Sequence, residues 1–192
     1  MTQRGENTMA ARIFAGRFLA RGMLVVALVL GGFSLRPGLA QEAEQVVNGQ
    51  KLGAWGVACQ ALAVNKTRCH LEQTLLRDTD RVFLARSLAV WSDDGSRGFL
   101  ALQVPVGAYL PSGIALRAEG AETVHPLTWQ SCSPELCEAL IDLDDALMQE
   151  LSQGTGKVVA TYRPRLGAEA RVFNFSVSGL IEGMQALRPG EG

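Results

Sequence analysis

The sequence predicts an all-β, mainly antiparallel fold: one β-sandwich-like domain with one or two short helices, after an N-terminal signal segment. Short apolar segments with period-two alternation recur along the chain, and Gly, Pro and Asp turns separate them at short spacing. No regular alternation of strand and helix, the mark of a parallel sheet, is visible. The 192 residues suit one domain, and 47% hydrophobic residues with 19% charged residues exclude an intrinsically disordered chain.

Residues 1–40 are predicted to be a signal peptide. Four arginines precede an uncharged apolar segment at residues 23–33, whose length is typical of a signal-peptide core. That segment is shorter than the roughly 20 residues that cross a bilayer. Gly38 and Ala40 place small residues at the −3 and −1 positions of a cleavage after Ala40. The alternative is an uncleaved membrane anchor.

The mature chain is mildly acidic. Without the five arginines and one glutamate of residues 1–40, it holds 13 basic and 18 acidic residues, a net charge of −5. Its global charge offers no attraction to nucleic acid or to lipid phosphates. We therefore expect no nucleic-acid partner. We also expect no integral membrane span in the mature chain. Residues 41–53 are predicted to be a flexible N-terminal arm, 54–188 the β domain and 189–192 a tail.

The first half of the domain reads as consecutive hairpins. Trp55, Val57 and Cys59 alternate with other residues and share one strand face. The Asp-Gly pair at residues 94–95 is typical of a hairpin turn. Predicted strands cover residues 55–59, 69–76, 82–91 and 99–104, with turns at 65–68, 77–80 and 93–96.

The second half adds strands around a proline turn. Pro111 and Gly113 suit the second and fourth positions of a type I turn. Ile114, Leu116 and Ala118 then alternate with polar residues. Predicted strands or extended segments cover residues 114–118, 125–130, 138–143, 157–163 and 172–177.

Two short helices are predicted. Leu143, Leu147 and Leu151 recur at helical spacing, and Gly154 and Gly156 follow. Asp142, Asp144 and Asp145 supply acids for the cap and first turn. The second helix covers residues 179–187, with Leu180, Met184 and Leu187 on one side.

Four cysteines, Cys59, Cys69, Cys132 and Cys137, all lie in the mature chain. An even number in an exported chain indicates two disulfides. Three pairings are allowed, and proximity favours Cys59–Cys69 and Cys132–Cys137. The spacings fit a zinc site poorly, and no C-x-x-C redox pair occurs.

Catalytic chemistry finds little support in the sequence. His70 and His125 are the only histidines, and each is interpreted as a surface or hydrogen-bonded imidazole. A Ser-His-Asp site can assemble from distant positions, but no G-x-S-x-G motif occurs, and turn geometry explains Ser112. We predict no catalytic, cofactor-binding or metal residues and no cofactor.

Two further residue sets have a structural and a functional interpretation. The acidic residues 142–145 could bind calcium, but the EF-hand pattern is not met and helix capping explains them more simply. The three tryptophans could mark a carbohydrate or protein surface, although their strand positions favour core packing. They are Trp55, Trp91 and Trp129.

Six motifs in order resemble the invasion-associated locus B family. They are W-G-V-A-C-Q (55–60), C-H-L-E-Q (69–73), L-Q-V-P-V-G-A-Y-L-P-S-G-I-A-L (102–116), C-S-P-E-L-C (132–137), D-L-D-D-A-L (142–147) and F-S-V-S-G-L (175–180). Leu136 departs from the glycine that members often have before the last cysteine. The resemblance implies an exported, β-rich α-proteobacterial protein, periplasmic or envelope-associated, linked in some pathogens to host-cell entry. It implies no catalytic residues.

The leading functional hypothesis is a disulfide-stabilised, non-enzymatic envelope protein that binds a protein or an envelope component and takes part in host-cell interaction or invasion. We expect it in the periplasm, secreted, or on the outer membrane. One alternative is a periplasmic hydrolase with a site at His125 or His70. That reading requires a histidine beside a serine and a carboxylate in a concave pocket. Another is a structural component, which would lack a sizeable exposed apolar patch.

Overall fold

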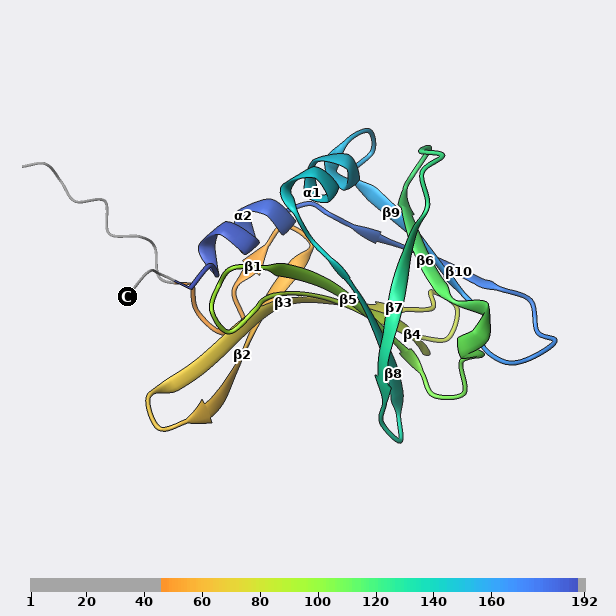
Figure 1. Ribbon diagram of the computed structural model, residues 1–192, viewed down its shortest axis with the longest axis horizontal. Helices are drawn as coiled ribbons and strands as arrows, with labels where there is room; N and C mark the ends of the chain where they lie inside the picture. Colours follow the sequence, from red (N-terminus) through yellow and green to blue (C-terminus); the bar gives the residue numbers. More distant parts are fainter. Residues whose placement is uncertain (1–45, 190–192) are drawn as a thin grey trace, which may run out of the picture. The chain divides into compact units, whose positions relative to one another are not determined.

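The computed structural model describes residues 46–189 (Figure 1). The predicted signal peptide at 1–40, residues 41–45 of the predicted arm and residues 190–192 lie outside the described residues. Ten strands, two α-helices and a short 3-10 helix at Leu110–Ser112 make up the described chain. They are β1 (Lys51–Leu52), β2 (Trp55–Ala63), β3 (Lys66–Leu76), β4 (Phe83–Trp91), β5 (Gly98–Pro105), β6 (Ile114–Ala118), β7 (His125–Cys132), β8 (Leu136–Asp142), α1 (Asp145–Ser152), β9 (Lys157–Tyr162), β10 (Arg171–Ser176) and α2 (Leu180–Ala186).

All strand pairs are antiparallel, in the order β1-β2-β3-β4-β5-β8-β7-β6-β9-β10. The sheet has two halves, which share strand β7: one runs from β1 through β5 and β8 to β7, and the other from β7 through β6 and β9 to β10. Its first residues, including Leu127, pair with β6, whereas the residues from Thr128 onward pair with β8. The predicted all-β fold with two short helices is confirmed.

The two ends of the strand order meet at Gln73 of β3. The side-chain amide of Gln73 donates to the carbonyl of Ala54 at 3.0 Å, and its Oε1 accepts from the backbone N–H of Ser176 at 3.0 Å. Beside it, the rings of Trp55 and Phe175 meet edge to face with centroids 6.2 Å apart. The first strands are thereby joined to β10, although no backbone ladder connects them.

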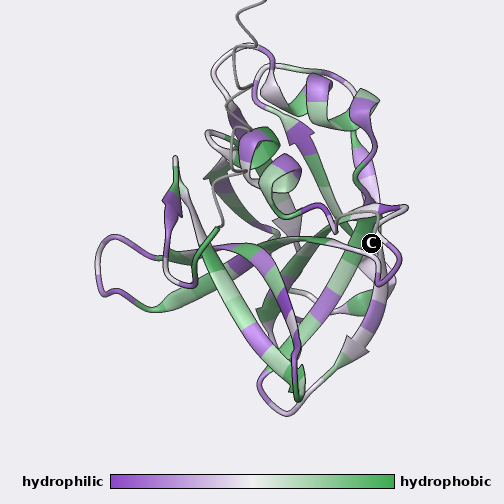
Figure 2. Cartoon of the chain, turned by 90° about the vertical axis from the view of Figure 1, so that its left-hand side faces the viewer, coloured by the Kyte–Doolittle hydropathy of each residue, from purple (hydrophilic) through white to green (hydrophobic). Residues whose placement is uncertain are grey.

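The core lies between the two halves of the sheet and under the helices. The side chains on one face of each strand fill the core. Along β5, these are the buried Leu100, Leu102 and Val104. Hydrophilic and hydrophobic bands accordingly alternate along the strands in Figure 2. Helix α1 contributes Leu147, Met148 and Leu151 to the core, and α2 contributes Leu180 and Met184.

Several boundaries differ from the sequence predictions. The turn predicted at 65–68 is shorter, because Thr67 and Arg68 pair with β2 and only Val64 and Asn65 separate the two strands. Leu143, expected in the first helix, is buried before it, and Asp144 caps α1 by accepting from the N–H of Leu147 at 2.8 Å. Leu187 follows the end of α2 and is partly buried.

The described part of the predicted flexible arm, residues 46–53, is held against the sheet. Leu52 is buried and belongs to β1, which pairs with β2. The N–H of Gly49 donates to the carbonyl of Val57 at 2.8 Å, and the Asn48 side chain accepts from the N–H of Cys59 at 2.9 Å. The expectation of a loose arm is therefore wrong for these residues, because buried Leu52 and these hydrogen bonds anchor an otherwise polar segment.

Candidate functional site

The outer face of the sheet, opposite the core, carries an apolar band formed by five side chains. Three strands contribute to this apolar band, and the register aligns them: Leu88 is opposite Ala101, Ala101 is opposite Leu140, and Val90 is opposite Phe99. All but the buried Ala101 are partly buried. None of the five is part of the core cluster or packs against it. The apolar band is Leu88 and Val90 of β4, Phe99 and Ala101 of β5, and Leu140 of β8.

The sequence of β4 explains how the apolar band arises. Side chains of a strand alternate between the two faces of a sheet. In β4, Ala85, Ser87 and Ala89 are buried toward the core, which turns Leu88 and Val90 outward. A strand that is apolar on both faces is typical of a sheet covered on both sides. In the described part of the chain both helices lie on the core side, so neither covers the outer face.

Polar and charged side chains surround the apolar band. The row beside it places Arg86 opposite Gln103 and Gln103 opposite Glu138, and the amide of Gln103 donates to the Glu138 carboxylate at 2.8 Å. At the other edge, Arg97 pairs with Asp142 at 2.5 Å and lies over the Phe99 ring, 5.0 Å from its centroid. An apolar surface that stays partly exposed outside the core and has a polar rim is typical of a protein-binding surface.

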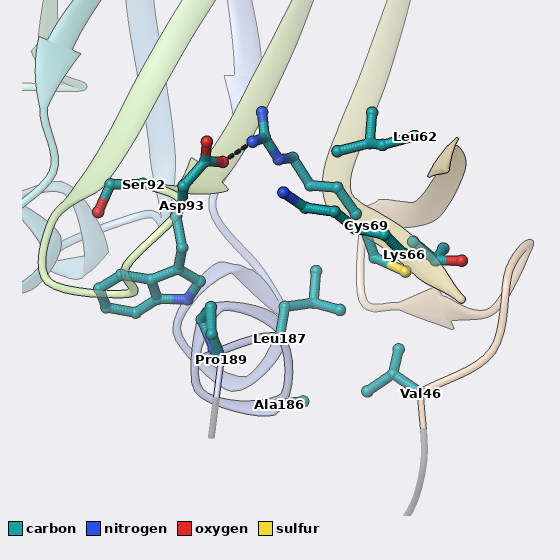
Figure 3. A pocket seen from close by; sticks show the side chains of 12 residues that line it. Val46, Leu62, Lys66, Cys69, Ser92, Asp93, Ala186, Leu187 and Pro189 are labelled. Atoms are coloured by element: carbon teal, nitrogen blue, oxygen red, sulfur yellow. Dashed lines mark ion pairs between the residues drawn. The ribbon is translucent and has the colours of Figure 1, made fainter. Parts of the chain in front are cut away.

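A cleft of about 420 Å³ separates the β2–β3 hairpin from the end of α2 (Figure 3). Leu62 and Lys66 line it on the hairpin side, and Leu187 and Pro189 line it on the other. An ion pair between Arg68 and Asp93 joins the hairpin to the end of β4. The cleft is open and of mixed polarity.

Trp91 lies between this cleft and two others. Its indole N–H donates to the carbonyl of Met184 at 2.7 Å, and the Arg188 guanidinium lies 4.9 Å from its ring centroid. The further clefts, of about 420 and 370 Å³, are lined by Trp91, Arg188 and the start of α1. Trp91 is only partly buried, whereas Trp55 is fully buried as core packing predicts. Trp129 is partly buried and packs against the core.

The two histidines lie apart, on β3 and β7. His125 Nε2 is 2.9 Å from Glu150 Oε1 on α1. Burial lowers the pKa of His70 below its ordinary 6.5, with Glu72 acting in the opposite direction, which favours a neutral imidazole. Neither histidine lines the three clefts around Trp91. No hydrogen bond among the described residues joins a histidine to a serine, and the Ser112 hydroxyl donates to the carbonyl of Tyr109 at 2.8 Å.

The acidic residues 142–145 have separate partners. Asp142 pairs with Arg97, and Asp144 caps α1. Within residues 46–189, no three His, Cys, Asp or Glu side chains gather in a way that could hold a metal ion. No helix in that range is both long and apolar enough to cross a membrane.

Disulfides join Cys59 to Cys69 and Cys132 to Cys137. Each links directly opposite residues of a hairpin, β2 with β3 and β7 with β8. The spacing in sequence had favoured these pairs. By contrast, the apolar band was missed, although the four consecutive apolar residues 88–91 were a signal for a strand with two apolar faces.

Comparisons with known proteins agree with this architecture. The family model described as "Invasion associated locus B (IalB) protein" matches residues 55–188. No curated protein matches the chain. The crystal structure of invasion associated protein B from Bartonella henselae is similar, with a TM-score of 0.58 and 18% sequence identity, covering 72% of this chain and 94% of that one. At this identity the likeness concerns the fold.

Proposed function

Because the chain belongs to the Invasion associated locus B (IalB) protein family, we propose that it is an exported, non-enzymatic protein of the bacterial envelope that binds a protein partner through the apolar band. The observation that carries the proposal is the position of this band. It crosses three neighbouring strands on the face that neither helix covers, and Arg86, Gln103 and Glu138 border it. We expect a chiefly structural envelope component to lack such a surface.

Two features support export. Disulfides are stable in the oxidising periplasm and outside the cell, and the structure has two of them. The basic and apolar composition of residues 1–40 fits a secretory signal. We therefore place the mature protein in the periplasm, with release from the cell or attachment to the outer membrane as its further destinations.

The hydrolase alternative gains no support from the geometry. A serine hydrolase requires a nucleophile within hydrogen-bond reach of its base. In the described residues, the hydrogen-bond partner of the His125 ring is Glu150, and Ser112 belongs to a different turn, where its hydroxyl bonds Tyr109.

In-cell crosslinking tests the binding surface. A photoreactive amino acid replaces Val90 in the apolar band or, as a matched control, Val172, an exposed valine of β10. We expect a discrete protein adduct from position 90 that weakens when Leu88→Lys is added, and none of the same size from position 172. Equal adducts from both positions, or none from position 90, would contradict the proposal.

Export has an independent test. Mass spectrometry of the periplasmic fraction should find a mature chain that begins at Gln41, and non-reducing peptide mapping should recover both cysteine pairs. An intact N-terminus at Met1 on the mature protein would disprove cleavage. Loss of host-cell entry in a deletion strain, restored by the wild-type chain, would extend the role to host interaction.

A further inference from the structure

The outer end of the β2–β3 hairpin extends beyond the core and is exposed to solvent. All nine residues from Gln60 to Arg68 are exposed, and the Cys59–Cys69 disulfide closes the base of this segment. Figure 1 shows the hairpin projecting away from the helices. Asn65 takes a positive φ of 60° in the two-residue turn, a conformation that asparagine tolerates better than most residues. The disulfide and the turn together fix an extended tip.

The tip of this hairpin is apolar. Val64 is 92% exposed and Leu62 is 44% exposed. Val64 has the highest exposure of the large hydrophobic residues in the described chain. Transfer of a water-exposed valine side chain into an apolar phase lowers the free energy of the system.

Both charged side chains at the outer end of the hairpin are positive. Between the two cysteines, Lys66 and Arg68 are the charged residues. Arg68 pairs with Asp93, whereas Lys66 takes part in no ion pair among the described residues. The tip is thus locally cationic, although the mature chain carries a net charge of −5.

We propose that this hairpin docks the protein onto an anionic phospholipid bilayer, with Val64 and Leu62 entering the interface and Lys66 contacting phosphate headgroups. A convex apolar tip beside cations fits a flat surface that is negatively charged outside and apolar below. Long cationic side chains reach headgroups while neighbouring apolar side chains insert. Because the global charge opposes adsorption to such a surface, docking requires both the tip and its local charge.

Docking by the hairpin is separate from the partner binding proposed above. The tip lies at the far end of β2 and β3, whereas the apolar band lies on β4, β5 and β8. A variant at Val64 should therefore leave crosslinking from position 90 in detergent-solubilised material unchanged. Failure of one proposal is thus distinguishable from failure of the other.

Co-sedimentation of the disulfide-bonded mature chain with vesicles tests the proposal. We expect binding to vesicles of equal parts phosphatidylcholine and phosphatidylglycerol, and weak or no binding to phosphatidylcholine alone. Val64→Asp should lower the partition coefficient about tenfold. Lys66→Ala should lower it about fivefold, an effect that added salt reduces.

Matched variants control for composition and folding. Val124→Asp changes another exposed valine, before β7, and Lys157→Ala changes an exposed lysine of β9. Both should bind like the wild type, and all four variants should unfold at the wild-type temperature. Wild-type binding that ignores phosphatidylglycerol, equal losses for Val64→Asp and Val124→Asp, or binding to polyglutamate without binding to vesicles would each overturn the proposal.

Discussion

Hydrogen bonds from single side chains join parts of this sheet that backbone strand pairing does not join. Gln73 joins β3 to the segment around Ala54 and to β10, where no strand ladder connects them. Asp94 organises the β4–β5 turn in a comparable way, since both Ser92 and Ser96 donate to its carboxylate. The hydrogen bonds of both polar residues depend on their position in the fold and on the geometry of their partners.

Replacing Gln73 should weaken the closure between the ends of the sheet. Gln73→Ala leaves the partly buried N–H of Ser176 without its acceptor, and we expect a loss of about 1–3 kcal/mol in the free energy of unfolding. Urea denaturation measures this loss. Gln130→Ala is the control, because the side chain of Gln130 is exposed and bonds only the nearby carbonyl of Thr128. Equal stability of both variants would show that the closure does not depend on Gln73.

The turn carboxylate of Asp94 should titrate at unusually low pH. Hydrogen bonds from the Ser92 hydroxyl, then from the N–H and hydroxyl of Ser96, lower the pKa of Asp94 from 3.8 to about 2. Because the folded pKa is depressed, its contribution to stability is present above pH 3.8 and is lost as pH falls toward about 2. Carboxyl NMR titration measures the midpoint, and Ser92→Ala should raise it. A midpoint near 3.8 in the wild type would refute these hydrogen bonds.

Helix α2 depends on the absence of a side chain at one position. Gly183 is buried against Leu71 of β3, and a Cβ atom at this position would lie 2.6 Å from Leu71 Cδ1. Glycine usually destabilises a helix interior, so its presence here is explained by this close approach of the helix to the sheet.

Filling that position should destabilise the fold in a way that a second change reverses. Gly183→Ala should cost about 1–3 kcal/mol by overpacking, partly offset by about 1 kcal/mol of helix propensity. In a Leu71→Ala background the clash is removed, so the same substitution should become neutral or stabilising. Thermal or urea unfolding of all four chains completes the cycle. Additive effects would mean that Gly183 and Leu71 do not determine the packing of α2.

Element types were largely predictable from the sequence, because they follow from local periodicity. The alternation in residues 55–59 and 172–177 predicted strands, and the aspartates before Leu147 predicted the cap of α1. The short turn at Val64 and Asn65 was not predicted, since polar Thr67 and Arg68 look like turn residues although they pair with β2. Strand pairing decided their conformation, and pairing is a non-local property.

The candidate site was less predictable, because it depends on the arrangement of the whole molecule. Period-two alternation says which residues share a face but not which face is covered. Whether Leu88 or Ala89 faces the core follows only from where the helices pack. Strand β7 is a further example, since its two halves pair with different neighbours without a break that the sequence reveals. Closure by Gln73 joins positions that are 103 residues apart.

The two faces of the central strands should respond differently to the same truncation. Leu102 is fully buried in the core, whereas Leu88 lies on the outer face and is only partly buried. Leu102→Ala should therefore cost about 2–5 kcal/mol of unfolding free energy. Leu88→Ala should cost about 1 kcal/mol, because less apolar surface returns to water. Urea unfolding of the isolated protein measures both.

In the cell, the two variants should rank in the opposite order for partner capture. Per folded molecule, Leu88→Ala should reduce the adduct formed from position 90 more than Leu102→Ala does. Equal losses in the free energy of unfolding would mean that Leu88 belongs to the core. That result would contradict the proposal that the apolar band is a binding surface.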